Sequence, residues 1–266
     1  CKEQQSYSTD VADCQEHFKP RKWIPEAKHR CNIERITHTQ RLKRFGPLGL
    51  PRLYPEPIII VGDKQNPRNA KLQELTSRSN ITKSLPPNFD VTLSSSNSFS
   101  AHRRTIPLTQ YLEEIQENNG VTTPHQLSNE TWYLFGETYG DEWKNLLQSY
   151  KLPPCHTCQD GLVALSFGVG NRGSGVQWHV HGPGFSEALH GRKHWVLYRN
   201  KPKINADESS LYWMEYIYTS LAQKELPFEC TLEPGDLIYF PDDWYHATIN
   251  LDHYTAFVST FTIEHL

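Results

Sequence analysis

Apolar and β-branched residues in the second half of the chain come in short runs that Gly and Pro separate. Runs of this length and composition favour β-strands over helices. Many short strands with turn residues between them predict a jelly roll or barrel, mostly β, with helices packed outside. The predicted strands are Leu162–Val169, Val176–His181, Ser186–His190, Lys193–Tyr198, Phe228–Leu232, Asp236–Phe240, His246–Asn250 and Thr255–Thr262.

The first 160 residues mix both periodicities. An early β-branched run predicts a buried strand, and apolar spacings of three to four predict helices. Residues 1–29 are polar and lack periodicity, so we expect an N-terminal arm before one domain at 30–266, with the barrel core at about 160–266. The expected elements are strands at Glu56–Gly62 and Trp132–Phe135, a strand, turn and returning strand within Phe89–Arg103, and helices at Asn66–Leu75, Leu108–Glu117 and Asp141–Tyr150.

Composition limits the classes of partner. A length of 266 residues suits one β-rich domain, and the formal net charge of -3 gives no general reason to bind nucleic acid or an anionic membrane. No run approaches the roughly 18 apolar residues of a membrane-spanning helix. We therefore expect neither a nucleic-acid partner nor membrane insertion.

Three features favour the secretory pathway. The sequence opens at Cys1 rather than at Met, which suggests removal of a signal peptide. Asn80 and Asn129 begin glycosylation sequons, Asn80-Ile81-Thr82 and Asn129-Glu130-Thr131. The six cysteines are an even number, as is typical of an oxidising compartment.

Cys155 and Cys158 have the spacing of a redox motif or half of a zinc site. No second CxxC pair exists in the sequence, and the flanking Pro153-Pro154 and Gln159-Asp160-Gly161 predict a surface loop. A short-range disulfide is the plainer interpretation.

A histidine cluster is the main candidate for chemistry. His179 and His181 are two residues apart, so on a strand both imidazoles face the same side. His246 follows the Pro234-Gly235 turn and the next strand, and a barrel could bring it opposite the pair. This is the pattern of the facial triad of non-heme iron enzymes, with His181 in place of the usual carboxylate. Most of the thirteen histidines are expected to be ordinary solvated or hydrogen-bonded side chains.

The order and spacing of several segments resemble the JmjC-domain family and its small cupin-like oxygenases. The segments are Pro57–Gly62, Leu108–Leu112, Ser166–His181, Gly191–Trp195 and Pro234–His246. The resemblance implies a double-stranded β-helix with a metal at His179, His181 and His246. Trp178–Glu187 and Phe228–Thr231 also resemble a branch of the family associated with the endoplasmic reticulum lumen. That likeness implies a lumenal glycoprotein and a Cys31–Cys230 disulfide.

By the same resemblance, Lys193 pairs with the distal carboxylate of 2-oxoglutarate; the alternative is an exposed lysine. Val176 stands where relatives place a threonine, and Ser259 stands near a common asparagine. Tyr133 is a candidate phenol for the cosubstrate or a core aromatic. Glu187 either substitutes as a ligand or, more plainly, faces solvent.

Two functions follow from the resemblance. One is an Fe(II)- and 2-oxoglutarate-dependent hydroxylase acting on a protein or peptide side chain. The other is a catalytically silent JmjC module that acts as a protein-complex adaptor or signalling regulator and holds zinc or no metal. A third neutral ligand at His181 favours it, because that ligand changes the iron chemistry and suits zinc as well. In both cases the expected partner is a protein, and the sequence specifies neither its identity nor an oligomeric state.

Overall fold

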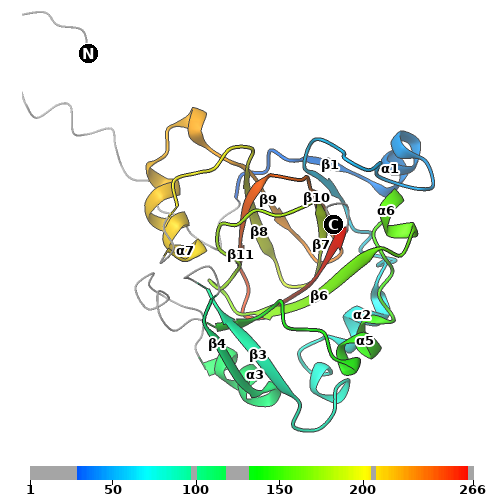
Figure 1. Cartoon of the computed structure of the whole chain (residues 1–266), viewed down its shortest axis with the longest axis vertical. Coiled ribbons are helices and arrows are strands. Elements are labelled where there is room, and N and C mark those ends of the chain that lie inside the picture. Colours follow the sequence, from blue (N-terminus) through cyan, green and yellow to red (C-terminus); the bar gives the residue numbers. More distant parts are fainter. Residues whose placement is uncertain (1–28, 97–100, 118–131, 205–207, 263–266) are drawn as a thin grey trace, which may run out of the picture.

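The computed structural model describes residues 29–96, 101–117, 132–204 and 208–262, and two sheets dominate it (Figure 1). The larger has the strand order β1-β2-β10-β7-β12-β6-β5-β3-β4, and the smaller has the order β11-β8-β9. The strands are β1 (Glu34–Ile36), β2 (Ile58–Ile60), β3 (Asp90–Ser95), β4 (Arg103–Pro107), β5 (Trp132–Leu134), β6 (Val163–Gly170), β7 (Gly184–His190), β8 (Lys193–Tyr198), β9 (Phe228–Leu232), β10 (Leu237–Phe240), β11 (Tyr245–Asn250) and β12 (Thr255–Thr262).

The two sheets curve around a common interior, as the ring of strands in Figure 1 shows. Every strand pair is antiparallel except β1 with β2. Ile238, Phe240, Trp195 and Leu197 belong to one buried cluster that joins the larger sheet to the smaller. This arrangement is the predicted jelly roll, with helices outside it.

The predicted strand Val176–His181 is the clearest difference within the barrel. This segment runs along β11 but forms only an isolated bridge, His179 with His246. Thr248 N donates to Val176 O further along. A Cβ on Gly175 would lie 2.0 Å from Thr248 O, so glycine permits a backbone approach that a regular ladder does not have.

The helices are α1 (His38–Phe45), α2 (Ala70–Leu75), α3 (Leu108–Glu117), α5 (Asp141–Leu147) and α6 (His156–Gln159). Helix α1 was not predicted, although Thr37 and Gln40 form a capping box at its start. The helix expected from Asn66 begins only at Ala70, because Asp63 Oδ1 accepts hydrogen bonds from the backbone N–H groups of Gln65 and Asn66 and holds that stretch in a turn.

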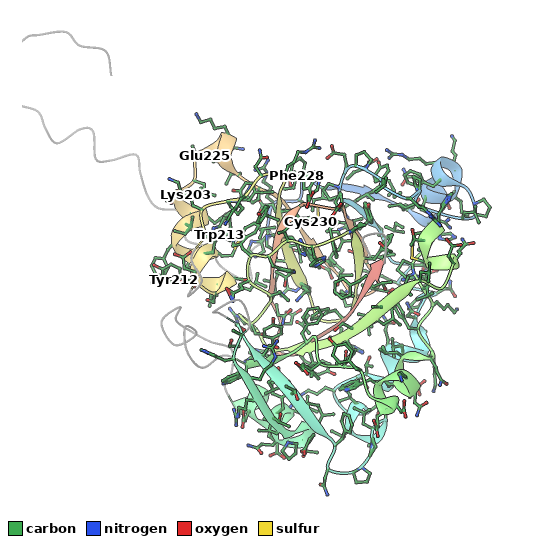
Figure 2. All side chains as sticks on the ribbon, viewed as in Figure 1. Lys203, Tyr212, Trp213, Glu225, Phe228 and Cys230 are labelled. Atoms are coloured by element: carbon green, nitrogen blue, oxygen red, sulfur yellow. A yellow bond between two sulfur atoms is a disulfide. The ribbon has the colours of Figure 1, made fainter. Side chains whose placement is uncertain are left out.

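A helical insertion between β8 and β9 covers the outside of the smaller sheet. It comprises α7 (Ser210–Tyr212), the π-helix η3 (Trp213–Ile217), and the short 3₁₀ helices η4 (Tyr218–Ser220) and η5 (Gln223–Glu225). Trp213, labelled in Figure 2, packs edge-on against Trp178 with ring centroids 4.9 Å apart. The insertion therefore buries the residue that precedes His179.

Within the part of the chain that the structure describes, two disulfides hold segments of the fold together. Cys31 bonds to Cys230 on β9, across 199 residues, and Cys155 bonds to Cys158. The expected surface loop at Cys155–Cys158 is wrong, because both side chains are buried and the backbone of Leu50 bridges to Cys155. Helix α6 begins there, with Cys155 as its N-cap and Cys155 Sγ accepting from Cys158 N–H. Within the described ranges, no helix is long and apolar enough to cross a membrane.

Candidate metal centre

Three imidazoles converge inside the barrel. His179 N donates to His246 O at 3.0 Å and His246 N to His179 O at 2.9 Å, so paired backbones place the two side chains together. The ring of His179 lies 4.1 Å from that of His246 and 5.1 Å from that of His181, centroid to centroid. One ligand nitrogen from each histidine lies within 4.8 Å of the other two.

Backbone carbonyls fix the tautomer of all three rings. Nδ1 of His179 lies 2.7 Å from Gln177 O, Nδ1 of His181 lies 2.7 Å from Gly182 O, and Nδ1 of His246 lies 2.8 Å from Trp244 O. A carbonyl only accepts, so each Nδ1 carries the proton and each Nε2 keeps a lone pair. This is the outer-shell arrangement that orients metal-binding histidines.

The same cluster disfavours protonation. Burial, and next the nearby His181, lower the pKa of His179 to about 4. Burial and then the other two histidines lower the pKa of His246 well below its usual value, and burial lowers that of His181. Three neutral imidazoles with converging lone pairs suit Fe(II) or Zn(II), so the residues present fit a divalent ion.

Glu187 neither ligates a metal nor faces solvent, which corrects both alternatives for it. Its carboxylate is fully buried outside the cluster, where it accepts from Asn69 Nδ2 at 2.8 and 3.0 Å and forms an ion pair with Arg68. Burial raises the pKa of Glu187, and the Arg68 guanidinium opposes that rise. The pair stabilises β7 against the segment that leads into α2.

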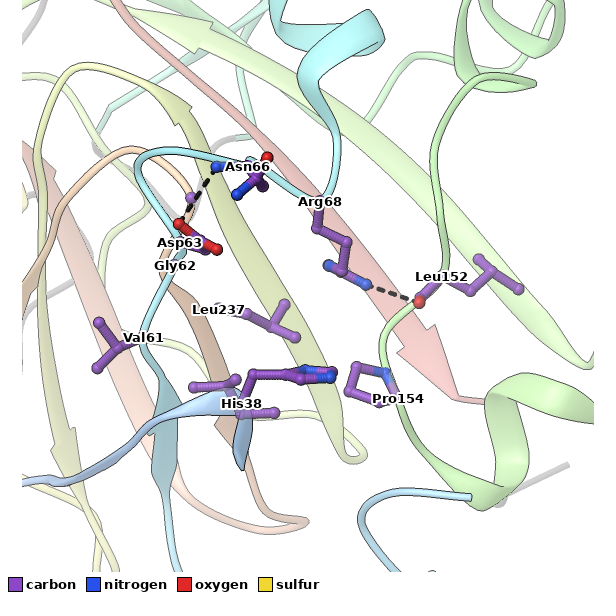
Figure 3. Close-up of a pocket in the computed structure, with 11 residues that line it drawn as sticks. His38, Val61, Gly62, Asp63, Asn66, Arg68, Leu152, Pro154 and Leu237 are labelled. Atoms are coloured by element: carbon purple, nitrogen blue, oxygen red, sulfur yellow. Dashed lines mark hydrogen bonds between the residues drawn. The ribbon is translucent and has the colours of Figure 1, made fainter. Parts of the chain in front are cut away.

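Arg68 also lines a cavity of about 300 Å³ outside the barrel, which Figure 3 shows. Its Nη1 donates to Leu152 O at 2.6 Å, and Asp63 in the same wall caps Gln65 and Asn66. Because these charged groups are already bonded within the chain, we do not place the candidate site there.

The interior cavity at the histidines is small and aromatic. Its volume is about 20 Å³, which is room for about one ion or water. The lining residues are Phe135, Val176, His179, His181, Lys193, Trp195, Phe240, His246, Thr248, Phe257, Ser259 and Phe261.

Lys193 lies on the wall of this cavity and is not the exposed lysine of the alternative interpretation. Its side chain is 1% exposed, and burial lowers the pKa of the ammonium group to about 7. Nζ donates to Asn250 Oδ1 at 3.0 Å and lies 3.9 Å from the centre of the Phe257 ring. Among the described residues, no carboxylate forms an ion pair with it.

Some of the other candidate cofactor residues line the cavity and one does not. Ser259 and Val176 line the cavity, and Ser259 Oγ donates to Ser186 Oγ at 3.3 Å. Tyr133 is buried next to Phe135 and Gly170, and it is not among the residues that line the cavity. Of the two predicted glycosylation sites, Asn80 is half-buried and Asn129 lies outside the described residues.

Sequence reasoning missed Asn250 and Phe257, the two residues that contact the Lys193 ammonium group. The signal was available in the alternation of the strands. His246, Thr248 and Asn250 occupy every second position of β11, and Phe257, Ser259 and Phe261 do so on β12. Knowing that His246 faces inward therefore indicates Asn250, and Ser259 likewise indicates Phe257.

The fit of 2-oxoglutarate differs from that of the metal. Lys193 supplies a buried cation on the wall shared with the histidines. The cavity, however, is too small for a five-carbon dicarboxylate, and the Phe257 ring and the Asn250 amide occupy the space around Nζ. The anchoring residue is present, but a cavity of this volume does not admit the molecule.

A jelly roll that encloses three converging histidines, which could hold a metal ion, defines a domain of the cupin type. The sequence profile of the JmjC domain matches residues 173–265, which contain all three histidines. The chain is 38% identical over 239 residues to "JmjC domain-containing protein 8" of Mus musculus, with 88% of this chain and 83% of the relative covered. The Homo sapiens protein of that name is 35% identical over 243 residues, covering 88% of this chain and 84% of the relative. The chain therefore belongs to the JmjC-domain family, and it resembles these proteins over most of their length.

Two further similarities are more distant. "Lysine-specific demethylase JMJ21" of Arabidopsis thaliana is 31% identical over 165 residues, with 51% of this chain but 17% of that protein covered. Among solved structures, "Crystal structure of Escherichia coli ribosomal oxygenase YcfD" aligns with a TM-score of 0.45 at 14% identity, over 90% of this chain and 54% of that one.

Proposed function

We propose that this chain is a metal-dependent JmjC-domain protein of the secretory pathway that hydroxylates a protein or peptide side chain with Fe(II) and 2-oxoglutarate. The observation that carries the proposal is the convergence of three unprotonated Nε2 atoms on a cavity that a buried lysine also lines. A buried cation without a carboxylate partner is costly unless a bound anion compensates it.

Different residues would hold the metal ion, exclude water and bind the anion. His179, His181 and His246 would hold the ion, and their Nδ1 hydrogen bonds keep the rings oriented. Fe(II) with its cosubstrate supplies the activation of oxygen. Trp195, Phe240 and Phe261 exclude water from the ligand face of the histidines. Lys193 provides the positive charge for an anion.

The proposed location in the secretory pathway, with the endoplasmic reticulum lumen as its place, rests on the cysteines and the sequons. The two disulfides suit an oxidising compartment. The predicted glycosylation at Asn80 and Asn129 would occur there.

A catalytically silent module that binds protein partners is the second candidate. Two observations favour it: the third ligand is His181 rather than a carboxylate, and the cavity of about 20 Å³ does not admit the cosubstrate as it stands. In such a module the ion, Fe(II) or zinc, would have a structural role.

Anaerobic reconstitution with Fe(II) separates the candidates. We would measure bound iron and 2-oxoglutarate decarboxylation in the native chain and in His181→Asp, which restores a carboxylate at this position. Stoichiometric iron with turnover by the native chain supports the hydroxylase. Iron binding without turnover, or turnover only in His181→Asp, supports the silent module.

A further inference from the structure

We infer that Phe257 is a gate over Lys193: in the closed position its ring occupies the space that the carboxylate of a dicarboxylic acid needs to reach the ammonium group. This inference rests on the proposed function, because it concerns the same cavity. It assigns the control of anion entry to a residue outside the metal ligands.

The ammonium group is covered on two sides. Lys193 Nζ donates a hydrogen bond of 3.0 Å to Asn250 Oδ1, and the Phe257 ring centre lies 3.9 Å from Nζ. An ammonium group has three donors, of which one is used in this way. A ring face attracts a cation but accepts no full hydrogen bond, so the Phe257 side is the weaker of the two covers.

The Asn250 cover is fixed. Asn250 Nδ2 donates to Ser174 Oγ at 3.1 Å, and Ser174 Oγ donates to Asn171 O at 2.7 Å. This chain of bonds turns Oδ1 towards Lys193. A Cβ on Gly170 would lie 2.5 Å from Asn250 Nδ2, so the glycine leaves the room that this orientation requires.

The position of the Phe257 ring over Lys193 depends on the glycine at position 168, which has no side chain. Gly168 is the partner of Phe257 in the register of β6 with β12, and a Cβ on Gly168 would lie 2.3 Å from the end of the ring. The ring therefore fills the place of a cross-strand side chain. The ring is held in place by its rotamer and by contact with Phe135, whose ring centroid lies 5.2 Å away. A phenyl ring has no polar atom with which to form a conventional hydrogen bond.

A closed cover reduces apparent affinity. If the ring must leave before an anion binds, the measured dissociation constant equals the intrinsic one divided by the open fraction. Removing the ring removes that factor. The geometry thus predicts that truncation of this buried aromatic tightens the binding of 2-oxoglutarate, although loss of an aromatic wall ordinarily weakens ligand binding.

Calorimetric titration of the full chain with 2-oxoglutarate tests the gate. The protein is loaded with Co(II), whose visible spectrum reports that each variant holds its metal. We expect Phe257→Ala to bind 2-oxoglutarate at least tenfold more tightly than the native chain. Phe185→Ala is the matched control, because Phe185 is as buried as Phe257 but packs against Tyr239 and does not line the cavity. It should leave the affinity within threefold of native, and Phe257→Ala with Lys193→Met should lose the gain.

Phe257→Leu is the second variant, because the smaller truncation keeps a branched apolar side chain in the core if Phe257→Ala does not fold. It is expected to give a gain in the same direction. Native binding that neither Phe257 variant tightens overturns the gate and leaves the proposed function intact. Failure of native and Phe257 variants alike to bind, with Co(II) in place, overturns the gate and the proposed use of 2-oxoglutarate together.

Discussion

Two buried charges, Glu187 and Lys193, lie on consecutive strands of the barrel and have opposite surroundings. Glu187 is compensated by the Arg68 guanidinium and by two hydrogen bonds from Asn69. Of the residues that the structure describes, the neutral Asn250 amide and the Phe257 ring are the ones that contact the Lys193 ammonium group. A compensated charge is part of the architecture, whereas an uncompensated one costs stability unless a ligand supplies the missing charge. The difference marks the inner cavity, rather than the Arg68 side, as the place where an anion is expected.

The largest expected effect on stability comes from removing the compensated charge of Glu187. Glu187→Gln removes the negative charge and leaves the Arg68 guanidinium without its partner, so we expect a loss of about 3–5 kcal/mol in the free energy of unfolding. Denaturant unfolding followed by tryptophan fluorescence measures it. Glu34→Gln is the control, because the Arg44–Glu34 pair is about half exposed and should change stability by less than about 1 kcal/mol. Equal effects of the two substitutions would contradict the distinction.

Removing the uncompensated charge of Lys193 should raise the free energy of unfolding instead of lowering it. Lys193→Met replaces a buried ammonium group by an apolar side chain of similar length, and we expect a gain of about 1–4 kcal/mol at pH 6 in the absence of ligands. The same unfolding assay measures the gain. Destabilisation of comparable size would mean that Asn250 and Phe257 compensate the charge better than their chemistry indicates.

A smaller and more specific effect is the pH dependence of the stability gained by Lys193→Met. Burial lowers the pKa of Lys193 to about 7, so between that value and the usual lysine pKa the unfolded chain binds a proton that the native chain does not. Native stability from this group therefore rises with pH across about 7 to 10.5, and the advantage of Lys193→Met shrinks over the same interval. His179 does not interfere, because burial already lowers its pKa to about 4. An advantage that stays constant from pH 6 to pH 10 would show that native Lys193 stays charged over this range, so that burial does not lower its pKa.

The strand pattern made the barrel and most of its inner face predictable. β8, β9 and β12 occupy the predicted ranges, because their alternation and their Gly and Pro boundaries are local properties. The convergence of His179, His181 and His246 followed from two-residue spacing and from the resemblance. Lys193 was assigned only through that resemblance.

The surroundings of each charge were not predictable from local sequence. Arg68 and Glu187 are 119 residues apart, and only the packing of α2 against β7 makes them a pair. The contact of Phe257 with Lys193 likewise depends on the register that places Gly168 opposite the ring. In both cases a long-range approach of backbones decides whether a buried charge is compensated.

A metal titration decides whether the three histidines hold one divalent ion. The native chain, His179→Ala, His246→Ala and the control His190→Ala would be titrated with Co(II) and read by visible spectrum and by metal content after gel filtration. His190 is hydrogen-bonded to Gln73 O, away from the cluster, and should not matter. We expect one ion per native chain, retained in the control and lost in the two ligand variants. A native chain that binds no ion, or ligand variants that bind as well as native, would contradict this expectation.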